Sequence, residues 1–357
     1  MTGRVAVLGA GGFIGNRTVE VLHQAGADVL PVVRRASGLA LPCRFDLPVR
    51  VADARSQHEV EEALVGCDAA VVSIAGDPQT IVGIIEPIYR AASGAGVRRL
   101  VYLSTASVHG QSPPSGTDET SPLSDRQPIE YNNAKVRAER LLLRCRATGT
   151  TEVVLLRPGI VWGPRSPWTG GLADELLAGR AVLVGGGHGI CNSIYVDNLV
   201  HAIRLALVAP GADRQALLVG DHERITWRDL YRPVAEALDV ELELVATPDE
   251  RQVELRKGHA ERLRTSPLAR RLLPAPIRAG LRAAYETRRG ATAASERPSP
   301  EVTLEQALLH TCAHQLPWTR ARAVLGYEPL VSFEDGCRRS RSWLEFAGYP
   351  VHGRSPG

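Results

Sequence analysis

The strongest constraint on the fold is a glycine-rich turn that joins an apolar run to a helical pattern. Residues 4–8, RVAVL, form a short apolar run that is typical of a buried parallel strand. The turn is GAGGFIG at 9–15, with its glycines spaced GxxGxxG, and helical spacing follows over 14–25 until Gly26. Small residues let the backbone approach a diphosphate, and the N–H groups at the helix start attract its charge. The turn therefore predicts a nucleotide site, with a purely structural turn as the alternative.

Strand-like and helix-like segments alternate along the first 160 residues. The helix expected at 56–65 begins at Ser56 and has Glu59 three residues on, which is the pattern of a capping box. The alternation predicts an α/β fold, a Rossmann-like doubly wound parallel sheet that binds its ligands at the carboxyl ends of the strands. The other apolar runs lie at 28–35, 68–76, 98–105 and 151–159, and the other helical patterns at 80–93 and 128–147.

A second region is expected after about residue 160, where the loops lengthen. A strand and a helix return at 193–207, and helical spacing returns at 315–347. We expect residues 1–165 to form an NADP-binding Rossmann domain, to which 190–215 return. Residues 166–347 are expected to be mainly a smaller, mostly helical C-terminal lobe that binds the substrate.

Two segments of this second region have distinctive compositions. Residues 250–290 are rich in arginine and carry helical spacing. We interpret them as a lid over the cleft, with contact to a membrane surface or to an oligomer partner as alternatives. Residues 290–301 are rich in Ala, Ser and Pro and are expected to form a mobile loop.

Overall composition excludes several classes of protein. The chain is 44% hydrophobic and 23% charged, and its net charge of +3 is too small to argue for nucleic acid. Six scattered cysteines without a CxxC pair fit a reducing compartment better than a disulfide framework. No secretory signal is evident, and no apolar run approaches the roughly 20 residues that span a bilayer. We expect a soluble, cytoplasmic protein without nucleic-acid or membrane partners, and leave a homodimer open.

The end of the second strand-like run bears on the choice of cofactor. NAD enzymes place an acid there for the ribose hydroxyls, whereas here Val33 is followed by Arg34 and Arg35. Because a guanidinium suits a 2′-phosphate, Arg34 favours NADP over NAD, unless both arginines are simply solvated. Asp53, which ends VRVAD, is expected near the adenine, with a helix N-terminal acid as the alternative.

The segment EYNNAK is unusual because only two of the 42 basic residues are lysines, Lys135 and Lys257. Tyr131 and Lys135 lie four apart in an expected helix and so share a face, as such pairs also do on many exposed helices. A nearby ammonium lowers the pKa of a phenol, which would make Tyr131 an acid or base near neutral pH. An arginine fork cannot act as a compact charge beneath a ribose, which gives a chemical reason for the lysine.

Hydroxyl side chains cluster where the fourth strand-like run ends. In LSTASVHG at 103–110, the hydroxyls are those of Ser104, Thr105 and Ser107. The carboxyl end of this strand faces the same cleft as the glycine turn. A hydroxyl there can bind a substrate carbonyl oxygen and stabilise negative charge on it. The alternative is that these hydroxyls only form the turn.

Together these motifs resemble the extended short-chain dehydrogenase/reductase family, also called the NAD-dependent epimerase/dehydratase family. GAGGFIG matches its cofactor loop and YNNAK its YxxxK pair. LSTASVHG is similar to its SSxxVYG segment, with Thr105 at the Ser/Thr position and His109 where Tyr is usual. Further likeness lies in LRPGIVWGP, IYVDNLVHAI and ARAVLGYEP. The resemblance covers roughly residues 1–210 and 315–347.

The resemblance implies hydride transfer between a nicotinamide and a carbinol or carbonyl carbon. Tyr131 would transfer the proton, Lys135 would hold the nicotinamide ribose and tune Tyr131, and Thr105 would hydrogen-bond the substrate oxygen. The cofactor-binding residues that it implies are Gly9, Gly12, Phe13, Ile14 and Gly15 around the diphosphate, Arg34 for NADP, and Asp53, Ala75, Lys135 and Pro158.

Two departures from the family pattern bear on the substrate. Sugar-nucleotide epimerases of the family carry an Asn at the position of Ile160 and an Arg near the position of Cys191, and both are polar handles for a diphosphate. Their replacement favours an NADP-dependent ketoreductase or alcohol dehydrogenase that acts on a fairly apolar small molecule or secondary metabolite. A nucleotide-sugar epimerase/dehydratase with internally recycled NAD(P) is the alternative, and a non-catalytic dinucleotide sensor is a third hypothesis.

A pair of histidines raises the question of a metal site. His310 and His314 lie four apart with Cys312 between them, a spacing that can bind a metal. No third ligand is evident in the sequence, so we expect no metal and interpret the pair as one face of a helix.

Overall fold

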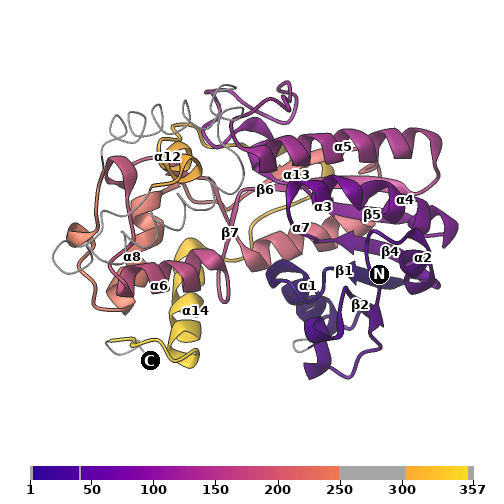
Figure 1. Ribbon diagram of the computed structural model, residues 1–357, viewed down its shortest axis with the longest axis horizontal. Helices are drawn as coiled ribbons and strands as arrows, with labels where there is room; N and C mark the ends of the chain where they lie inside the picture. The colour runs from indigo at the N-terminus through magenta and orange to yellow at the C-terminus, as the bar shows by residue number, and fades with distance from the viewer. Residues whose placement is uncertain (1–2, 40–41, 249–301, 353–357) are drawn as a thin grey trace, which may run out of the picture.

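The computed structural model describes residues 3–39, 42–248 and 302–352. The predicted lid at 250–290 and the predicted mobile loop at 290–301 lie outside these residues. Central to the structure is a seven-stranded parallel sheet with the strand order β10-β6-β5-β4-β1-β2-β3 (Figure 1). Its strands are β1 (Arg4–Leu8), β2 (Val29–Val33), β3 (Arg50–Val51), β4 (Cys67–Val72), β5 (Arg99–Leu103), β6 (Glu152–Pro158) and β10 (Ala216–Val219).

Helices cover both faces of this sheet, because side chains that alternate along each strand enter two separate cores. In β1, Ala6 and Leu8 enter one core, and Val5 and Val7 enter the other. The first core is closed by α2 (Gln57–Leu64), α3 (Pro78–Gly83), α4 (Ile85–Gly94) and α5 (Glu130–Thr148). The second is closed by α1 (Phe13–Gln24), α7 (Val196–Val208) and α13 (Thr319–Leu325). The predicted doubly wound α/β fold is confirmed.

The strand order reverses at β1, which lies between β2 and β4. The chain builds the sheet outward through β2 to β3 on one side, and from β4 onward on the other side. In open sheets of this kind the ligand binds in the crevice beyond the carboxyl ends of the strands at the reversal. The fold therefore directs attention to the turns that follow Leu8, Val33 and Val72.

Most of the predicted elements are present, and four details differ. Strands β3 and β10 were not expected, because β3 is a two-residue exposed edge and β10 is a four-residue run. The helical pattern at 80–93 is two helices that meet at Ile84. The expected capping box is incomplete: Ser56 Oγ accepts from the Glu59 N–H at 3.3 Å, but the Glu59 carboxylate accepts from the Asp53 N–H at 2.9 Å.

The remaining described elements pack around a third core beside the sheet (Figure 1). This core centres on buried aromatic residues, among them Trp162, Tyr195, Trp227 and Tyr231. It is formed by α6 (Leu172–Leu177), α8 (Trp227–Ala237), α12 (Leu304–His310) and α14 (Phe333–Phe346), with β7 (Ile160–Trp162) paired to β9 (Ser193–Tyr195) and β8 (Ile190–Cys191) paired to β11 (Ile225–Thr226). The expected strand and helix at 193–207 are present, but β9 pairs with β7 and not with the main sheet.

Short helical turns complete the described chain. They are η1 (Ala36–Leu39), η2 (Pro42–Arg44), η3 (Ala106–His109), η4 (Pro167–Gly171), η5 (Val184–Gly187) and η6 (Leu242–Leu244). In the described ranges, no helix combines the length and apolarity that a bilayer-crossing segment needs.

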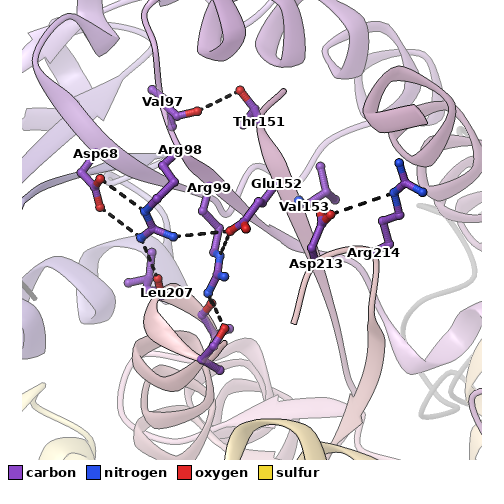
Figure 2. Close-up of polar contacts among 12 residues, drawn as sticks. Asp68, Val97, Arg98, Arg99, Thr151, Glu152, Val153, Leu207, Asp213 and Arg214 are labelled. Atoms are coloured by element: carbon purple, nitrogen blue, oxygen red, sulfur yellow. Dashed lines mark hydrogen bonds and ion pairs between the residues drawn. The ribbon is translucent and has the colours of Figure 1, made fainter. Parts of the chain in front are cut away.

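A buried arginine links the end of the sheet at which the strands begin to the C-terminal end of α7 (Figure 2). Arg99, at the start of β5, donates to Glu152 at 2.7 Å and to the carbonyls of Ala206 and Ala209 at 2.9 and 2.8 Å. These carbonyls end α7, where a cation satisfies both the unpaired oxygens and the helix dipole. The neighbouring Arg98 pairs with Asp68 at 3.1 Å. This network lies at the opposite end of the strands from the crevice, so we assign it to stability.

Candidate active site

The glycine turn between β1 and α1 has a backbone that requires glycine. Gly9 has a φ of +88°, which L side chains rarely adopt. A Cβ on Gly15 would lie 2.2 Å from the Gly9 carbonyl oxygen. Gly12 is the N-cap of α1, and no side chain caps the helix there. The start of α1 therefore presents its N–H groups to an incoming anion.

A cavity of about 450 Å³ opens at this turn, within the size range of small-molecule and cofactor sites. Its walls come from the carboxyl ends of β1, β2 and β4, as the strand order requires. Of the predicted cofactor-binding residues, the lining includes Gly9, Gly12, Phe13, Ile14, Arg34, Asp53 and Ala75. It does not include Gly15, which is buried under the turn, Lys135, or Pro158, which is buried in β6 and pairs with Val219.

The charges in this lining suit a phosphorylated ligand. Arg34 is exposed at the end of β2, and Arg55, which the sequence analysis did not single out, lies opposite with a hydrogen bond to Thr80 at 2.6 Å. Asp53 lines the cavity and also accepts from the Arg55 N–H at 3.0 Å. Asp53 thus lies in the lining of the cavity, and it is not the N-terminal acid of the next helix, because Ser56 is the N-cap of α2 and Glu59 is the acid of its first turn. A glycine cradle, an uncapped helix start and two guanidinium groups fit a dinucleotide.

Thr105 and Tyr131 are brought together beyond the carboxyl end of β5. Thr105 is buried at the start of η3, where its Oγ1 accepts from the Ser107 N–H at 3.2 Å. Tyr131 is the second residue of α5, and its phenol lies close enough to the Thr105 side chain for that hydroxyl to influence the pKa of the phenol. The start of η3 and the first turn of α5, which a long loop joins, thus bring these two hydroxyl groups together. This is the pairing expected from the sequence.

The Tyr131 phenol is protonated at neutral pH, because burial and the negative charge of Glu305 raise its pKa to about 12. The neighbouring Thr105 side chain opposes this shift. The sequence-based expectation of a phenol that titrates near neutral pH is therefore wrong, because the net shift of this pKa is upward. In the described part of the chain, the Lys135 Nζ donates to the Leu103 carbonyl at 2.8 Å and to the Tyr102 hydroxyl at 3.3 Å, and not to Tyr131.

Lys135 is buried beneath this pair, which lowers its pKa to about 8. Its Nζ lies 4.8 Å from the centre of the Tyr102 ring, a cation–π contact. Glu139, one helical turn further along α5, opposes the fall in pKa. The lysine can therefore exchange between its charged and neutral forms close to physiological pH.

Comparison with known proteins agrees with this geometry. Residues 5–220 match the model of the NAD dependent epimerase/dehydratase family. The chain belongs to this family. It is 33% identical over 258 residues to the 3 beta-hydroxysteroid dehydrogenase/Delta 5→4-isomerase of Mycobacterium tuberculosis, covering 66% of this chain and 69% of the relative. It is 26% identical over 366 residues to the 2-alkyl-3-oxoalkanoate reductase of Shewanella oneidensis, covering 95% and 85% of the two chains.

Solved structures of the family share the fold. The UDP-glucose 4-epimerase of Thermotoga maritima superposes with a TM-score of 0.69 at 19% identity, covering 96% of this chain and 99% of the epimerase. At that identity the likeness concerns the fold alone. Family membership makes this protein an NAD(P)-dependent oxidoreductase of the extended short-chain dehydrogenase/reductase type.

In this epimerase/dehydratase-family enzyme, amide side chains that the sequence analysis missed join the loop after β5 to the first turn of α5. Asn132 donates to Gln111 at 2.6 Å and to Gln127 at 2.8 Å, and Gln111 donates back to Asn132 at 3.2 Å. Gln111 also donates to Glu305 of α12 at 3.2 Å. This network ties the loop after β5 and the start of α12 to the helical turn that carries Tyr131. No local pattern signals the bonds of Gln111, because its partners Asn132 and Glu305 lie 21 and 194 positions away.

The two histidines that raised the question of a metal have separate roles. His310 is buried, stacks on Trp227 with 4.6 Å between ring centres, and accepts from the Val184 N–H at 3.1 Å. Burial lowers its pKa to about 4. His314 lies 3.0 Å from the Thr117 carbonyl oxygen. Among the described residues, no three metal-ligating side chains gather at one point.

Proposed function

We propose that this enzyme is an NADP-dependent ketoreductase that converts a fairly apolar ketone into a secondary alcohol. The observation that carries the proposal is the position of the Thr105 hydroxyl beside the protonated phenol of Tyr131. Two hydroxyl groups at one point suit a carbonyl oxygen, which needs a hydrogen-bond donor and then a proton as negative charge develops on it. The protonated phenol is the form in which a reduction begins.

Each side chain then has a definite task in the reduction. The nicotinamide, when bound, supplies the hydride. Tyr131 donates its phenolic proton to the carbonyl oxygen, and Thr105 donates a hydrogen bond to the same oxygen. The phenolate that remains on Tyr131 is stabilised by the ammonium of Lys135, one helical turn away. The backbone carbonyl of Leu103 holds Lys135 in place for this task.

Arg34 supports NADP as the preferred cofactor. Its side chain lines the nucleotide cavity at the end of β2, the position that recognises the adenosine ribose in folds of this type. Arg35, Ala36 and Ser37 follow, so no acid is offered to a ribose 2′-hydroxyl there. A planar guanidinium binds a phosphate with two parallel hydrogen bonds, and NADP carries that extra phosphate.

The surroundings of Thr105 support an apolar substrate. The wall next to Thr105, at Ala106 and Ser107, continues into Ile160, Trp227 and Leu309 of the third core and into the apolar side chains of Ile190 and Leu316. Ile160 offers no hydrogen bond to a diphosphate, and the nearby Cys191 is buried. We therefore propose that the helical C-terminal region binds the substrate and that the sheet region, residues 1–165 with 190–215, binds NADP. The relatives named for a steroid and for an alkyl-oxoalkanoate make an apolar substrate reasonable.

A substrate screen with NADPH tests the proposal. The purified full chain is mixed with a panel of aliphatic, aromatic and steroid ketones, and NADPH oxidation is followed by its absorbance. We expect oxidation with at least one apolar ketone and none with UDP- or dTDP-sugars. The proposal is contradicted if the protein retains NAD(P) through purification, converts a nucleotide sugar and shows no net oxidation. It is also contradicted if NADPH binds and no member of the panel reacts.

A further inference from the structure

A carboxylate from the C-terminal region lies beside the proposed proton donor. Glu305 is in the first turn of α12, and one of its oxygens accepts a hydrogen bond from Gln111 at 3.2 Å. Gln111 is paired with Asn132, the residue that follows Tyr131. The charge of Glu305 reaches Tyr131 itself, because it contributes to the raised pKa of the phenol. The substrate side of the site therefore includes a fixed negative charge.

The position of Glu305 is fixed from both ends of α12. At the start of α12, Thr303 and Gln306 form a capping box. At its end, Leu309 accepts from the Trp227 indole N–H at 2.8 Å, and the His310 ring stacks on the same indole. A helix that is held at both ends fixes the backbone position of Glu305, and the hydrogen bond from Gln111 holds its exposed carboxylate.

Two other charged side chains of α5, Lys135 and Glu139, are buried on the far side of the helix turn from solvent. Lys135 is buried, and its Nζ donates to the Leu103 carbonyl and the Tyr102 hydroxyl. Glu139 behind it is paired with Arg157 at 2.7 Å. Glu305, by contrast, is exposed and faces the same space as the loop after β5. A ligand that displaces water from this space would meet the charge of Glu305 with less screening.

We propose that Glu305 is a specificity-determining residue that rejects substrates with a carboxylate close to the reacting carbonyl, as in a 3-oxo acid, and favours neutral ketones. This rests on the proposed ketoreductase function. Two carboxylates in a dehydrated cleft repel each other, whereas an ester, a hydroxyl or a methyl group in the same place does not. A 2-alkyl-3-oxoalkanoate carries its carboxylate on the carbon next to the ketone carbon, so it brings a negative charge close to the reacting oxygen. This enzyme thus prefers an uncharged ketone, whereas the relative from Shewanella oneidensis is named for such an acid.

A matched pair of ligands tests the charge filter. A 2-alkyl-3-oxoalkanoate and its methyl ester are titrated by calorimetry into the full chain saturated with NADP⁺, in which a ketone binds but cannot react. We expect the ester to bind at least about tenfold more tightly than the acid, as a like-charge contact requires. Glu305→Gln keeps the size and the acceptor oxygen, and should bring the two affinities close together. Glu345→Gln removes an exposed carboxylate from α14 and should leave their ratio as in the parent.

Equal affinity of acid and ester for the parent enzyme would overturn the charge filter, as would a ratio that Glu305→Gln leaves unchanged. A second measurement needs no substrate. The ultraviolet titration of tyrosine ionisation is compared between the parent and Glu305→Gln, each with and without Tyr131→Phe, so that the difference isolates Tyr131. We expect the Tyr131 midpoint to fall in Glu305→Gln, and an unchanged midpoint would overturn the proximity on which the filter depends. If neither ligand binds but the Tyr131 midpoint falls in Glu305→Gln, the ketoreductase function is contradicted. The position of Glu305 near Tyr131 is then still supported.

Discussion

The carboxylate of Glu139 accepts two hydrogen bonds from the guanidinium of Arg157, at 2.7 and 3.0 Å, one helical turn below Lys135. Both side chains are buried, and the Ser104 hydroxyl donates to the same carboxylate. Arg157 in turn lies 3.2 Å from the His109 imidazole, whose pKa falls to about 4 because of burial and the arginine's charge. A buried and fully hydrogen-bonded ion pair thus lies directly behind Lys135 on α5.

Removing Arg157 should destabilise the fold more than removing the whole pair. Arg157→Met leaves Glu139 as an uncompensated buried charge, and we expect a loss of about 3–5 kcal/mol in the free energy of unfolding. The double variant Arg157→Met with Glu139→Gln should recover part of that loss, since the stranded charge is gone. Chemical denaturation of the three proteins measures the difference. A single variant as stable as the parent would show that the pair contributes nothing.

The rate of ketone reduction should fall as the pH rises through about 8, the pKa of Lys135. Burial lowers this pKa, so the ammonium is present below that pH and lost above it. The charged form stabilises the phenolate that forms on Tyr131. Tyr131 keeps its proton through the same range, because its own pKa is raised to about 12. A pH profile of kcat/KM for reduction measures this descending limb, the decline in rate above about pH 8.

Lys135→Met supplies the control for this pH profile. The variant should be slower and should lack the limb near pH 8 that we assign to Lys135. A parent profile that stays level through pH 10, or a limb that persists in Lys135→Met, would contradict the role given to the lysine.

Arg34 should determine the preference for NADP. Arg34→Ala removes a guanidinium that lines the nucleotide cavity, and we expect the Kd for NADPH to rise about 10- to 100-fold while that for NADH changes little. Arg35→Ala is the matched control, because Arg35 is an exposed neighbour that does not line the cavity. Fluorescence titration of both nucleotides measures the two constants. An equal effect of the two substitutions, or an equal loss of NADPH and NADH binding, would contradict the assignment.

The sheet could be predicted from the sequence because its central strands are covered on both faces. Such strands are continuous apolar runs, as in RVAVL and LVYL, and the turn at Gly9 and Gly15 follows from steric limits on any side chain there. The pairing of Thr105 with Tyr131 also followed, since Thr105 comes directly after β5 and Tyr131 lies in the first turn of α5, the long helix that follows this strand. The edge strands β3 and β10 did not follow, because short segments carry too few residues to show a period.

The chemical environment of the site was not predictable in the same way. The contact between Gln111 and Glu305 joins residues 194 positions apart, and no local pattern records it. The pKa of Tyr131 depends on how deeply the phenol is buried and on that distant carboxylate, so a rule based on the neighbouring lysine gave the wrong direction. Sequence spacing identifies which groups meet, whereas burial decides their charge.

The most direct test of the account is the effect of Tyr131→Phe on catalysis and on cofactor binding, measured on the same protein. The substitution removes only the phenolic oxygen, so kcat/KM for ketone reduction should fall about 10²- to 10⁴-fold, the range for loss of a general acid. The Kd for NADPH should stay close to that of the parent, because Tyr131 does not line the nucleotide cavity. Full activity in Tyr131→Phe would contradict the assignment of Tyr131 as the proton donor.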